Sequence, residues 1–425
     1  MLWLSDRIKY RREGFGAIVL HLDTKETRFF NLAAAQLLET CRIGATLDEV
    51  LGCIPGEIAH VTRFVDDLLA QRILSTTGTP RTEGMFFTDI TAFPESHLYS
   101  PLGVEIEVTL KCYRRCTYCC YESHPSVDTG SELTLEEWKA ILAQLWEAGV
   151  FYIRFTGGDP FARRDFVDLL DFADSLDLII SVGSDLTILN EVHVERLARC
   201  RNLLMVQTTL DGSTAAIADE HRGAGNWARV VHGLETLRRR EIPVVVGTVL
   251  RRNNVHDIKA IAALVGGYGA KGYSIAPLYS AGRGRQMEEL IPTNDDLEIA
   301  NRYFREAVAE GLVQPLDPAW PELASRWTPG ERDRMFDDQP YLVGVPDRLL
   351  RIDPTGRCYT SVQVKELIGD SVFVGSIRHA SLNEIWNEAP LLTAMRSLGS
   401  QNKAFGQVID IRNVGRRLKE ATSVQ

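Results

Sequence analysis

The sequence predicts an α/β protein whose central part is a partial (β/α)6 TIM-like barrel, flanked by an N-terminal winged-helix-like α+β domain and a smaller C-terminal region. Strand-like and helix-like patterns alternate about six times between residues 103 and 311, which is typical of βα units. Three strand-like runs followed by three helical patterns fill residues 1–75. A chain of 425 residues is long enough for two or three such domains.

The first 75 residues predict three short strands followed by three helices. The expected strands are 8–10, 16–22 and 27–32, and the expected helices are 33–41, 47–50 and 57–71. In the last helix, apolar residues from Ile58 to Leu69 recur at helical spacing, which gives it one apolar face. Residues 76–102 contain Gly, Pro and Thr without a helical period, and they predict a linker.

Residues 103–311 form the predicted barrel. Its strands are expected at 104–110, 151–155, 178–182, 203–210, 243–250 and 273–278, each followed by a helical pattern. In a barrel of parallel strands, functional residues come from the carboxyl ends of the strands. The cysteine-containing and polar segments that follow these runs are therefore the candidate site.

Cys112, Cys116 and Cys119 follow the first barrel strand with the spacing CxxxCxxC. A [4Fe–4S] cluster normally takes four thiolates, so three thiolates leave one iron open to a substrate or cofactor. A structural zinc ion needs a fourth ligand, for which Cys120 is the nearest candidate, and zinc remains the alternative. The eight cysteines show no extracellular pattern, so disulfides are not expected.

The CxxxCxxC motif, with the aromatic Tyr118 before its last cysteine, resembles that of the radical S-adenosylmethionine (SAM) superfamily. The resemblance implies that SAM binds the open iron and is cleaved after one-electron reduction. The products are methionine and a 5′-deoxyadenosyl radical, which abstracts hydrogen from the substrate. The expected cofactors are therefore one [4Fe–4S] cluster and SAM, with an electron donor such as flavodoxin or ferredoxin.

The same resemblance places the SAM contacts on the cysteine loop and at the ends of the second, third and fourth barrel strands. The implied residues are Tyr118, Gly157, Gly158, Asp159, Ser184, Asp185, Thr209 and Arg222. Asp159 stands where the family has a glutamate that binds the SAM amine, and Asp185 where it usually has an asparagine. Simpler roles stay open for Asp211, as a helix N-cap, and for Arg222, as a surface charge. No catalytic acid or base is identified.

The N-terminal order of elements resembles the RiPP recognition element, a PqqD-like domain related to the pyrroloquinoline quinone (PQQ) peptide chaperone. RiPPs are ribosomally made, modified peptides. The matching segments are 16–20 and 28–32, the latter running into a helix. In that family an extended leader peptide adds as a strand beside the third strand and packs on the third helix. A DNA-binding winged helix is the alternative, but its recognition helix should be basic, and here Arg63 is followed by Asp66 and Asp67.

The C-terminal region, 312–425, contains a predicted hairpin at 349–353 and 357–362, followed by a capped helix start at 381–386. These segments resemble the SPASM or twitch extension of peptide-modifying radical SAM enzymes, which carries several cysteines for auxiliary clusters. Here Cys358 is the one cysteine of the region, so a degenerate extension without an auxiliary cluster is expected. Cys358 itself is expected to be a small buried residue.

Composition agrees with a globular enzyme. The chain is 45% hydrophobic and 24% charged, with a formal net charge of -10 that argues against a nucleic-acid partner. No secretory signal or membrane span is evident, so a cytoplasmic location is expected. The expected function is a radical SAM enzyme that binds a precursor peptide, with its leader on residues 1–75, and modifies a core residue. The alternative is a radical SAM enzyme acting on a small molecule or a folded protein.

Overall fold

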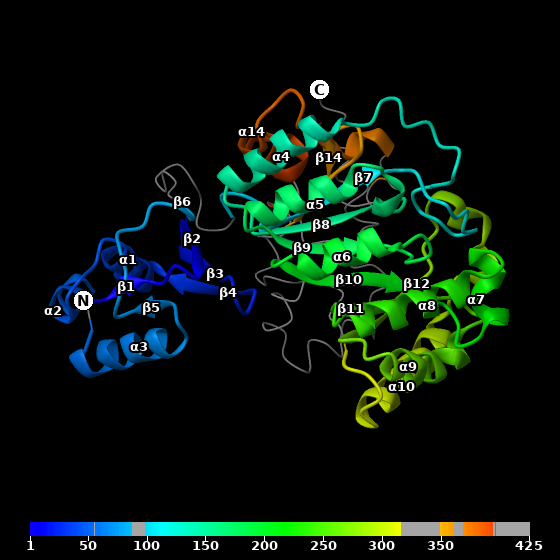
Figure 1. The fold of residues 1–425 in the computed structure, drawn as a ribbon, viewed down its shortest axis with the longest axis horizontal. Helices are drawn as coiled ribbons and strands as arrows, with labels where there is room; N and C mark the ends of the chain where they lie inside the picture. The colour runs from blue at the N-terminus through cyan, green and yellow to red at the C-terminus, as the bar shows by residue number, and fades with distance from the viewer. Residues whose placement is uncertain are drawn as a thin grey trace.

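The N-terminal domain and the barrel pack against each other in the computed structural model, which describes residues 1–54, 56–86, 98–315, 349–360, 365, 369–393 and 396 (Figure 1). The N-terminal domain has a four-stranded sheet in the order β4-β3-β2-β6 and a two-stranded sheet of β1 and β5. Its strands are β1 (Trp3–Leu4), β2 (Ile8–Glu13), β3 (Gly16–His21), β4 (Glu26–Asn31), β5 (Leu74–Ser75) and β6 (Met85–Phe86).

Three helices follow β4, in the predicted order. They are α1 (Leu32–Cys41), α2 (Leu47–Cys53) and α3 (Ile58–Ala70). The structure differs from the predicted linker, because Met85 and Phe86 form β6, a parallel edge strand beside β2. A strand of two residues has too few positions to show a period, and β1 and β5 escaped prediction for the same reason. The segment 87–97 of the predicted linker lies outside the described residues.

The barrel sheet contains six parallel strands in chain order, as predicted. They are β7 (Gly103–Thr109), β8 (Tyr152–Gly157), β9 (Ile179–Gly183), β10 (Leu203–Thr209), β11 (Val244–Leu250) and β12 (Gly272–Pro277). The C-terminal strand β13 (Leu349–Ile352) adds in parallel beside β7, and β14 (Arg357–Tyr359) and β15 (Phe373–Ser376) follow antiparallel. The predicted hairpin is therefore present and extends the barrel sheet, which does not close on itself among the described strands.

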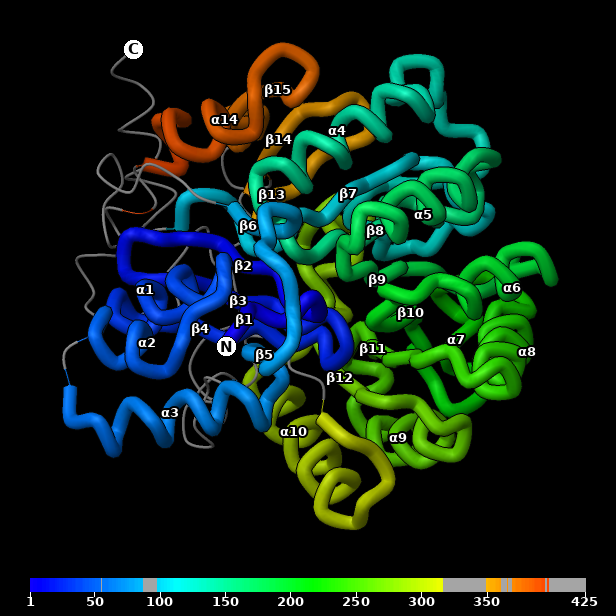
Figure 2. Tube along the Cα trace, turned by 60° about the vertical axis from the view of Figure 1, so that its left-hand side comes forward, coloured from blue at the N-terminus to red at the C-terminus, as the bar shows by residue number. Residues whose placement is uncertain are grey.

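Helices cover the outer face of this sheet (Figure 2). They are α4 (Leu135–Glu147), α5 (Phe166–Ser175), α6 (Glu191–Arg199), α7 (Ala215–Arg222), α8 (Asn226–Arg239), α9 (Ile258–Gly267), α10 (Asn294–Ala309) and α14 (Leu382–Glu388), with short 3-10 turns η2 (Pro160–Ala162), η3 (Val255–Asp257), η4 (Gly282–Gln286), η5 (Glu288–Leu290) and η6 (Gly369–Val372). The sequence did not predict α7, a short and largely polar helix. None of the described helices has the length and apolar character needed to cross a membrane.

The strand β7 shows how the barrel wall separates an apolar face from a polar one. Val104, Ile106 and Val108 belong to the main apolar core between the sheet and the helices. Side chains alternate along a strand, so Glu105 and Glu107 point to the opposite face, the inside of the barrel. Both glutamates are nonetheless buried.

The N-terminal domain docks against the amino ends of the barrel strands. Ile18 and Leu20 of β3, with Leu22, form a buried apolar cluster with Phe151, Tyr152 and Ile179 at the starts of β8 and β9. Figure 1 shows this domain on one side of the barrel, with the loop after β7 on the side away from it. The N-terminal domain thus covers the amino ends of the barrel strands, and the loop after β7 lies at their carboxyl ends.

Polar contacts reinforce this junction. Arg11 is fully buried and donates hydrogen bonds to the carbonyl oxygens of Gly149 (2.7 Å), Ser100 (3.0 Å) and Pro101 (3.1 Å), while its Nε pairs with Glu13 at 2.7 Å. Burying a guanidinium is costly unless its donors are used, and these acceptors come from both domains. The two domains therefore form one packed unit.

Candidate active site

The cysteine loop begins directly after β7 and is held by backbone contacts from the opposite part of the barrel. The N–H of Thr117 donates to the carbonyl of His221 at 2.9 Å. Arg283 donates from its side chain to the carbonyl of Cys116 (2.8 Å) and from its backbone to that of Cys119 (3.1 Å). Two of the three cysteines are thus positioned by the turn after β12.

The three thiols are the candidate ligands of the cluster. Among the described residues, no group of three or more His, Cys, Asp or Glu side chains is gathered closely enough to hold a metal ion. In a [4Fe–4S] cluster each iron takes its own thiolate, so the sulfur atoms stand apart. Burial raises the pKa of Cys112 and of Cys116, although the Arg222 guanidinium lowers the pKa of Cys116. Cysteine binds iron as the thiolate, so a cluster held here would take these side chains in their deprotonated form.

Gly157 and Gly158 are required by the cysteine loop itself. A Cβ on Gly157, whose φ is +126°, would lie 2.2 Å from the carbonyl oxygen of Thr109, and one on Gly158 would lie 2.2 Å from that of Lys111. The N–H of Gly158 donates to the carbonyl of Thr109 at 2.7 Å, and the N–H of Asp159 to that of Lys111 at 3.0 Å. These glycines therefore let β8 run against the start of the loop.

Asp159 is buried at the meeting point of β8 and β9. Its Oδ2 accepts hydrogen bonds from the hydroxyl of Ser184 (2.8 Å) and the N–H of Asp185 (3.1 Å), and its Oδ1 accepts one from the N–H of Phe161 (3.0 Å). Burial, followed by the charge of Asp185, raises the pKa of Asp159. A carboxylate offers about four acceptor positions, so room for one further donor remains.

Asp211, Arg222 and Tyr118 form a buried polar group at the ends of β10 and β11. Asp211 accepts hydrogen bonds from the Nε of Arg222 (2.6 Å), from the hydroxyl of Tyr118 and from the N–H of Val249 (2.8 Å). The N-cap of α7 is Thr214, so the alternative that Asp211 caps a helix is wrong. Arg222 is buried, so the alternative of a surface charge is wrong as well.

Sequence reasoning missed Arg251, which follows β11 directly. It is fully buried, its guanidinium lies 5.5 Å from the Tyr118 ring, and its Nη1 is 3.6 Å from Asp211. Neither Nη1 nor Nη2 has a hydrogen-bond partner among the described residues. Arg251 and Arg222 place two positive charges around the single carboxylate of Asp211. The guanidinium of Arg251 therefore keeps unused donors, and one of the two positive charges lacks a matching carboxylate in this group. Its position at a strand end was the signal that could have revealed it.

The remaining predicted residues are placed as follows. Thr209 is the half-buried last residue of β10. Asp185 lies 3.4 Å from the Nε of Arg114 in the cysteine loop. In the turn after β12, which was not part of that prediction, Gly282 could not carry a side chain, because its Cβ would lie 2.6 Å from the carbonyl oxygens of Cys119 and Cys120. Cys358 has no exposed surface and belongs to the main apolar core, as expected for a small buried residue.

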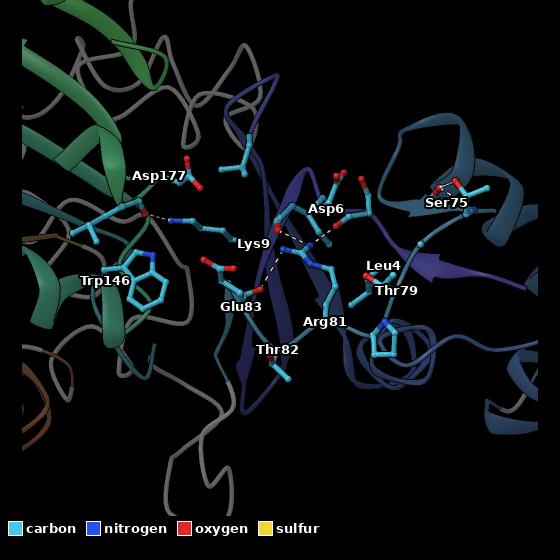
Figure 3. A pocket seen from close by; sticks show the side chains of 18 of the residues that line it. Leu4, Asp6, Lys9, Ser75, Thr79, Arg81, Thr82, Glu83, Trp146 and Asp177 are labelled. Carbon is cyan, nitrogen blue, oxygen red and sulfur yellow. Dashed lines mark hydrogen bonds between the residues drawn. The ribbon is translucent and has the colours of Figure 1, made fainter. Parts of the chain in front are cut away.

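A cavity of about 800 Å³ lies elsewhere, between the N-terminal domain and the barrel (Figure 3). Lys9 and Arg81 line it from the N-terminal side, and Trp146 and Asp177 from the barrel side. Lys9 donates to the carbonyl of Leu176 at 2.9 Å, and burial lowers its pKa to about 8. None of the predicted site residues lines this cavity, so it is a crevice of the domain junction.

Comparison with known proteins identifies the same family as the cysteine motif. Residues 106–265 match the model of the Radical SAM superfamily. A PqqA peptide cyclase from Gluconobacter oxydans is 31% identical over 303 residues, which cover 70% of this chain and 79% of the cyclase. The mycofactocin maturase MftC from Mycobacterium ulcerans is 29% identical over 305 residues, covering 71% of this chain and 79% of the maturase.

A solved structure agrees over a longer stretch. Streptococcus suis SuiB bound to S-adenosylmethionine has a TM-score of 0.67 at 16% identity, covering 93% of this chain and 90% of SuiB. At this identity the likeness concerns the fold, and its coverage takes in the N-terminal domain as well as the barrel. The family's cofactors are a [4Fe–4S] cluster and SAM, and this chain shares them with its relatives. This chain belongs to the radical SAM superfamily.

Proposed function

We propose that this protein is a radical SAM enzyme that binds a ribosomal precursor peptide through its N-terminal domain and modifies one of its residues by hydrogen abstraction. Support comes from the relatives named as a peptide cyclase and a maturase, and from SuiB, which has also been solved with its precursor peptide SuiA. The electron is expected from a flavodoxin or ferredoxin, and the protein is expected to act in the cytoplasm.

In this proposal, Cys112, Cys116 and Cys119 hold the cluster, and the cluster with SAM supplies the 5′-deoxyadenosyl radical. The strand ends around them hold SAM: Tyr118, Gly157, Gly158, Asp159, Ser184, Asp185, Thr209 and Arg222. Asp159 has an acceptor position left for an ammonium group. Arg251 joins this set, because its unused guanidinium donors suit a carboxylate.

One observation carries the peptide-binding part. The strand β4 is at the edge of its sheet, and among the described strands it pairs on one side alone, with β3. An edge strand can offer backbone N–H and C=O groups to an added strand. The rings of Phe30 on β4 and Phe64 on α3 have centroids 6.4 Å apart in an edge-to-face contact. Strand and helix therefore present aromatic side chains beside that edge. This is the arrangement that an extended leader peptide requires.

Deleting the N-terminal domain would be a poor test, because it would expose the apolar surface of Phe151, Tyr152 and Ile179. A point variant is sharper. Phe64→Ala should weaken binding of the peptide encoded beside the gene by about tenfold or more, since aromatic anchors of an interface contribute about 2 kcal/mol. Fluorescence anisotropy of the labelled peptide measures this.

The matched control is Phe172→Ala, another half-buried phenylalanine, on α5 of the barrel. It should bind the peptide like the unaltered enzyme. Equal affinities for the two variants would refute the leader site at β4 and α3. Mass spectrometry of the peptide after co-expression tests the modification itself, and an unmodified peptide with intact SAM cleavage would favour a different substrate.

A further inference from the structure

Two buried glutamates of β7 face the inside of the barrel in different surroundings. Glu105 is 6% exposed and Glu107 is 3% exposed. Glu105 forms an ion pair with Arg351 and lies 3.6 Å from Arg154, and it accepts a hydrogen bond from the hydroxyl of Tyr121 at 3.3 Å. Glu105 therefore has two cationic partners, Arg351 and Arg154.

Glu107 lacks such partners. Its carboxylate accepts a hydrogen bond from the hydroxyl of Tyr359, and among the described residues no cation lies within ion-pair distance of it. Burial raises the pKa of Glu107 to about 7, against the opposing effects of the Tyr359 hydrogen bond and the charge of Arg351. Neighbouring carboxyls whose environments differ in this way often divide into a fixed charge and a proton-transfer group.

The position of Glu107 connects it to the candidate active site. In the sheet it lies opposite Thr156, the residue before Gly157. Tyr359 comes from β14 of the C-terminal region, and its apolar cluster includes Cys120 and Tyr121, which follow Cys119 directly. The carboxyl group therefore stands where the barrel wall, the cysteine loop and the C-terminal region meet.

We propose that Glu107 is the proton acceptor for the substrate residue, and that Tyr359 is the residue that positions it. The inference rests on the proposed function. After hydrogen abstraction, an N–H or O–H bond of the substrate radical breaks, its proton forms an O–H bond on the Glu107 carboxylate, and the electron pair stays on the substrate. No electron is transferred in this step, so it needs no oxidant.

The charged and titratable groups that act on Glu107 come from β7 itself, from the C-terminal strands and from the segment after the cysteine loop, while Thr156 of β8, opposite Glu107 in the sheet, does not titrate. They are Glu105 on β7, Arg351 on β13, Asp353 in the following turn, Tyr359 on β14, and Cys120 and Tyr121 after the cysteine loop. Proton acceptance needs the ionised form, which is present above the pKa. The yield of modified peptide per 5′-deoxyadenosine should therefore rise with pH through about 7.

The test measures that coupling ratio in the reconstituted holoenzyme with the peptide encoded beside the gene. Glu107→Gln keeps the shape of the side chain but cannot accept the proton. The ratio should fall by about a hundredfold and lose its rise with pH, because general bases contribute about 10²–10⁴-fold. A Glu107→Gln enzyme with the ratio and pH profile of the unaltered enzyme would overturn the inference.

Tyr359→Phe is the second variant, and it decides the matter where Glu107→Gln fails to fold. It keeps the ring in its apolar cluster but removes the donor that stabilises the ionised carboxylate. The midpoint of the pH profile should move upward by about one unit. An unmoved midpoint means that Tyr359 has a packing role alone and contradicts the inference. Absence of any modified peptide from the unaltered enzyme would instead count against the proposed function.

Discussion

The two ends of the barrel strands are built for different purposes. At the amino ends, β3 of the N-terminal domain covers Phe151, Tyr152 and Ile179 with apolar side chains, and the buried Arg11 at this junction is paired with Glu13. At the carboxyl ends, Asp159, Asp211 and two arginines are buried beside a loop of three cysteines. Burying charged groups lowers the stability of a fold unless they are paired. The amino ends, which bury mainly apolar surface, therefore stabilise the fold, while the carboxyl ends are arranged for binding and chemistry.

This difference implies that substitutions at the two ends should have separable effects. A change at the apolar end should lower the free energy of unfolding and leave the chemistry intact. A change at the polar end should remove a cofactor or a contact while the fold persists. Three substitutions test this separation, and the first has the largest expected effect.

Cys116→Ala should abolish SAM cleavage and the visible absorbance of the cluster, because two remaining thiolates do not hold the cube. Iron content and 5′-deoxyadenosine formation after anaerobic reconstitution measure both. Cys358→Ala is the control, since Cys358 is buried in the apolar core and should leave the iron content unchanged. Retention of iron and SAM cleavage by Cys116→Ala would end the radical enzyme interpretation.

Leu20→Ala should lower the free energy of unfolding by about 3 kcal/mol, because it leaves a cavity in a packed apolar cluster. Leu20 has no exposed surface. Denaturant unfolding of the holoenzyme measures the loss, and SAM cleavage in buffer should persist. Leu47→Ala, at a leucine that is 40% exposed, should change stability little. A Leu20→Ala enzyme that is fully stable but inactive would contradict the separation of the two ends.

Arg251→Gln should raise the dissociation constant for SAM by about tenfold, since a hydrogen bond to a charged group contributes about 1.5 kcal/mol. Equilibrium dialysis of the reconstituted enzyme with labelled SAM measures it. The neighbouring Arg252→Gln is the matched control, because the Arg252 side chain is 48% exposed and pairs with Asp296 instead. Equal SAM affinities of the two variants would remove Arg251 from the site.

Strand-like runs alternating with helical patterns predicted the six barrel strands and most of the helices between them, because each strand is followed by a helix that packs on the sheet. The cysteine spacing predicted the family and its cofactors. The roles of individual residues depended on contacts distant in sequence. Gly157 and Gly158, predicted as SAM contacts, also accommodate the backbone of the cysteine loop, which the sequence did not reveal. For Asp211 the sequence left open a helix N-cap, whereas in the structure it anchors Tyr118 and Arg222.

The docking of the N-terminal domain has a consequence for the length of the substrate. A leader held beside β4 starts from the amino side of the barrel, while the cysteine loop lies past the carboxyl end of β7, a strand of seven residues. Seven residues of strand span about 23 Å, and an extended peptide covers at most about 3.5 Å per residue. Under the proposed function, at least about seven residues would then separate the anchored leader from the modified position, and residues nearer the anchor would not reach the cysteine loop.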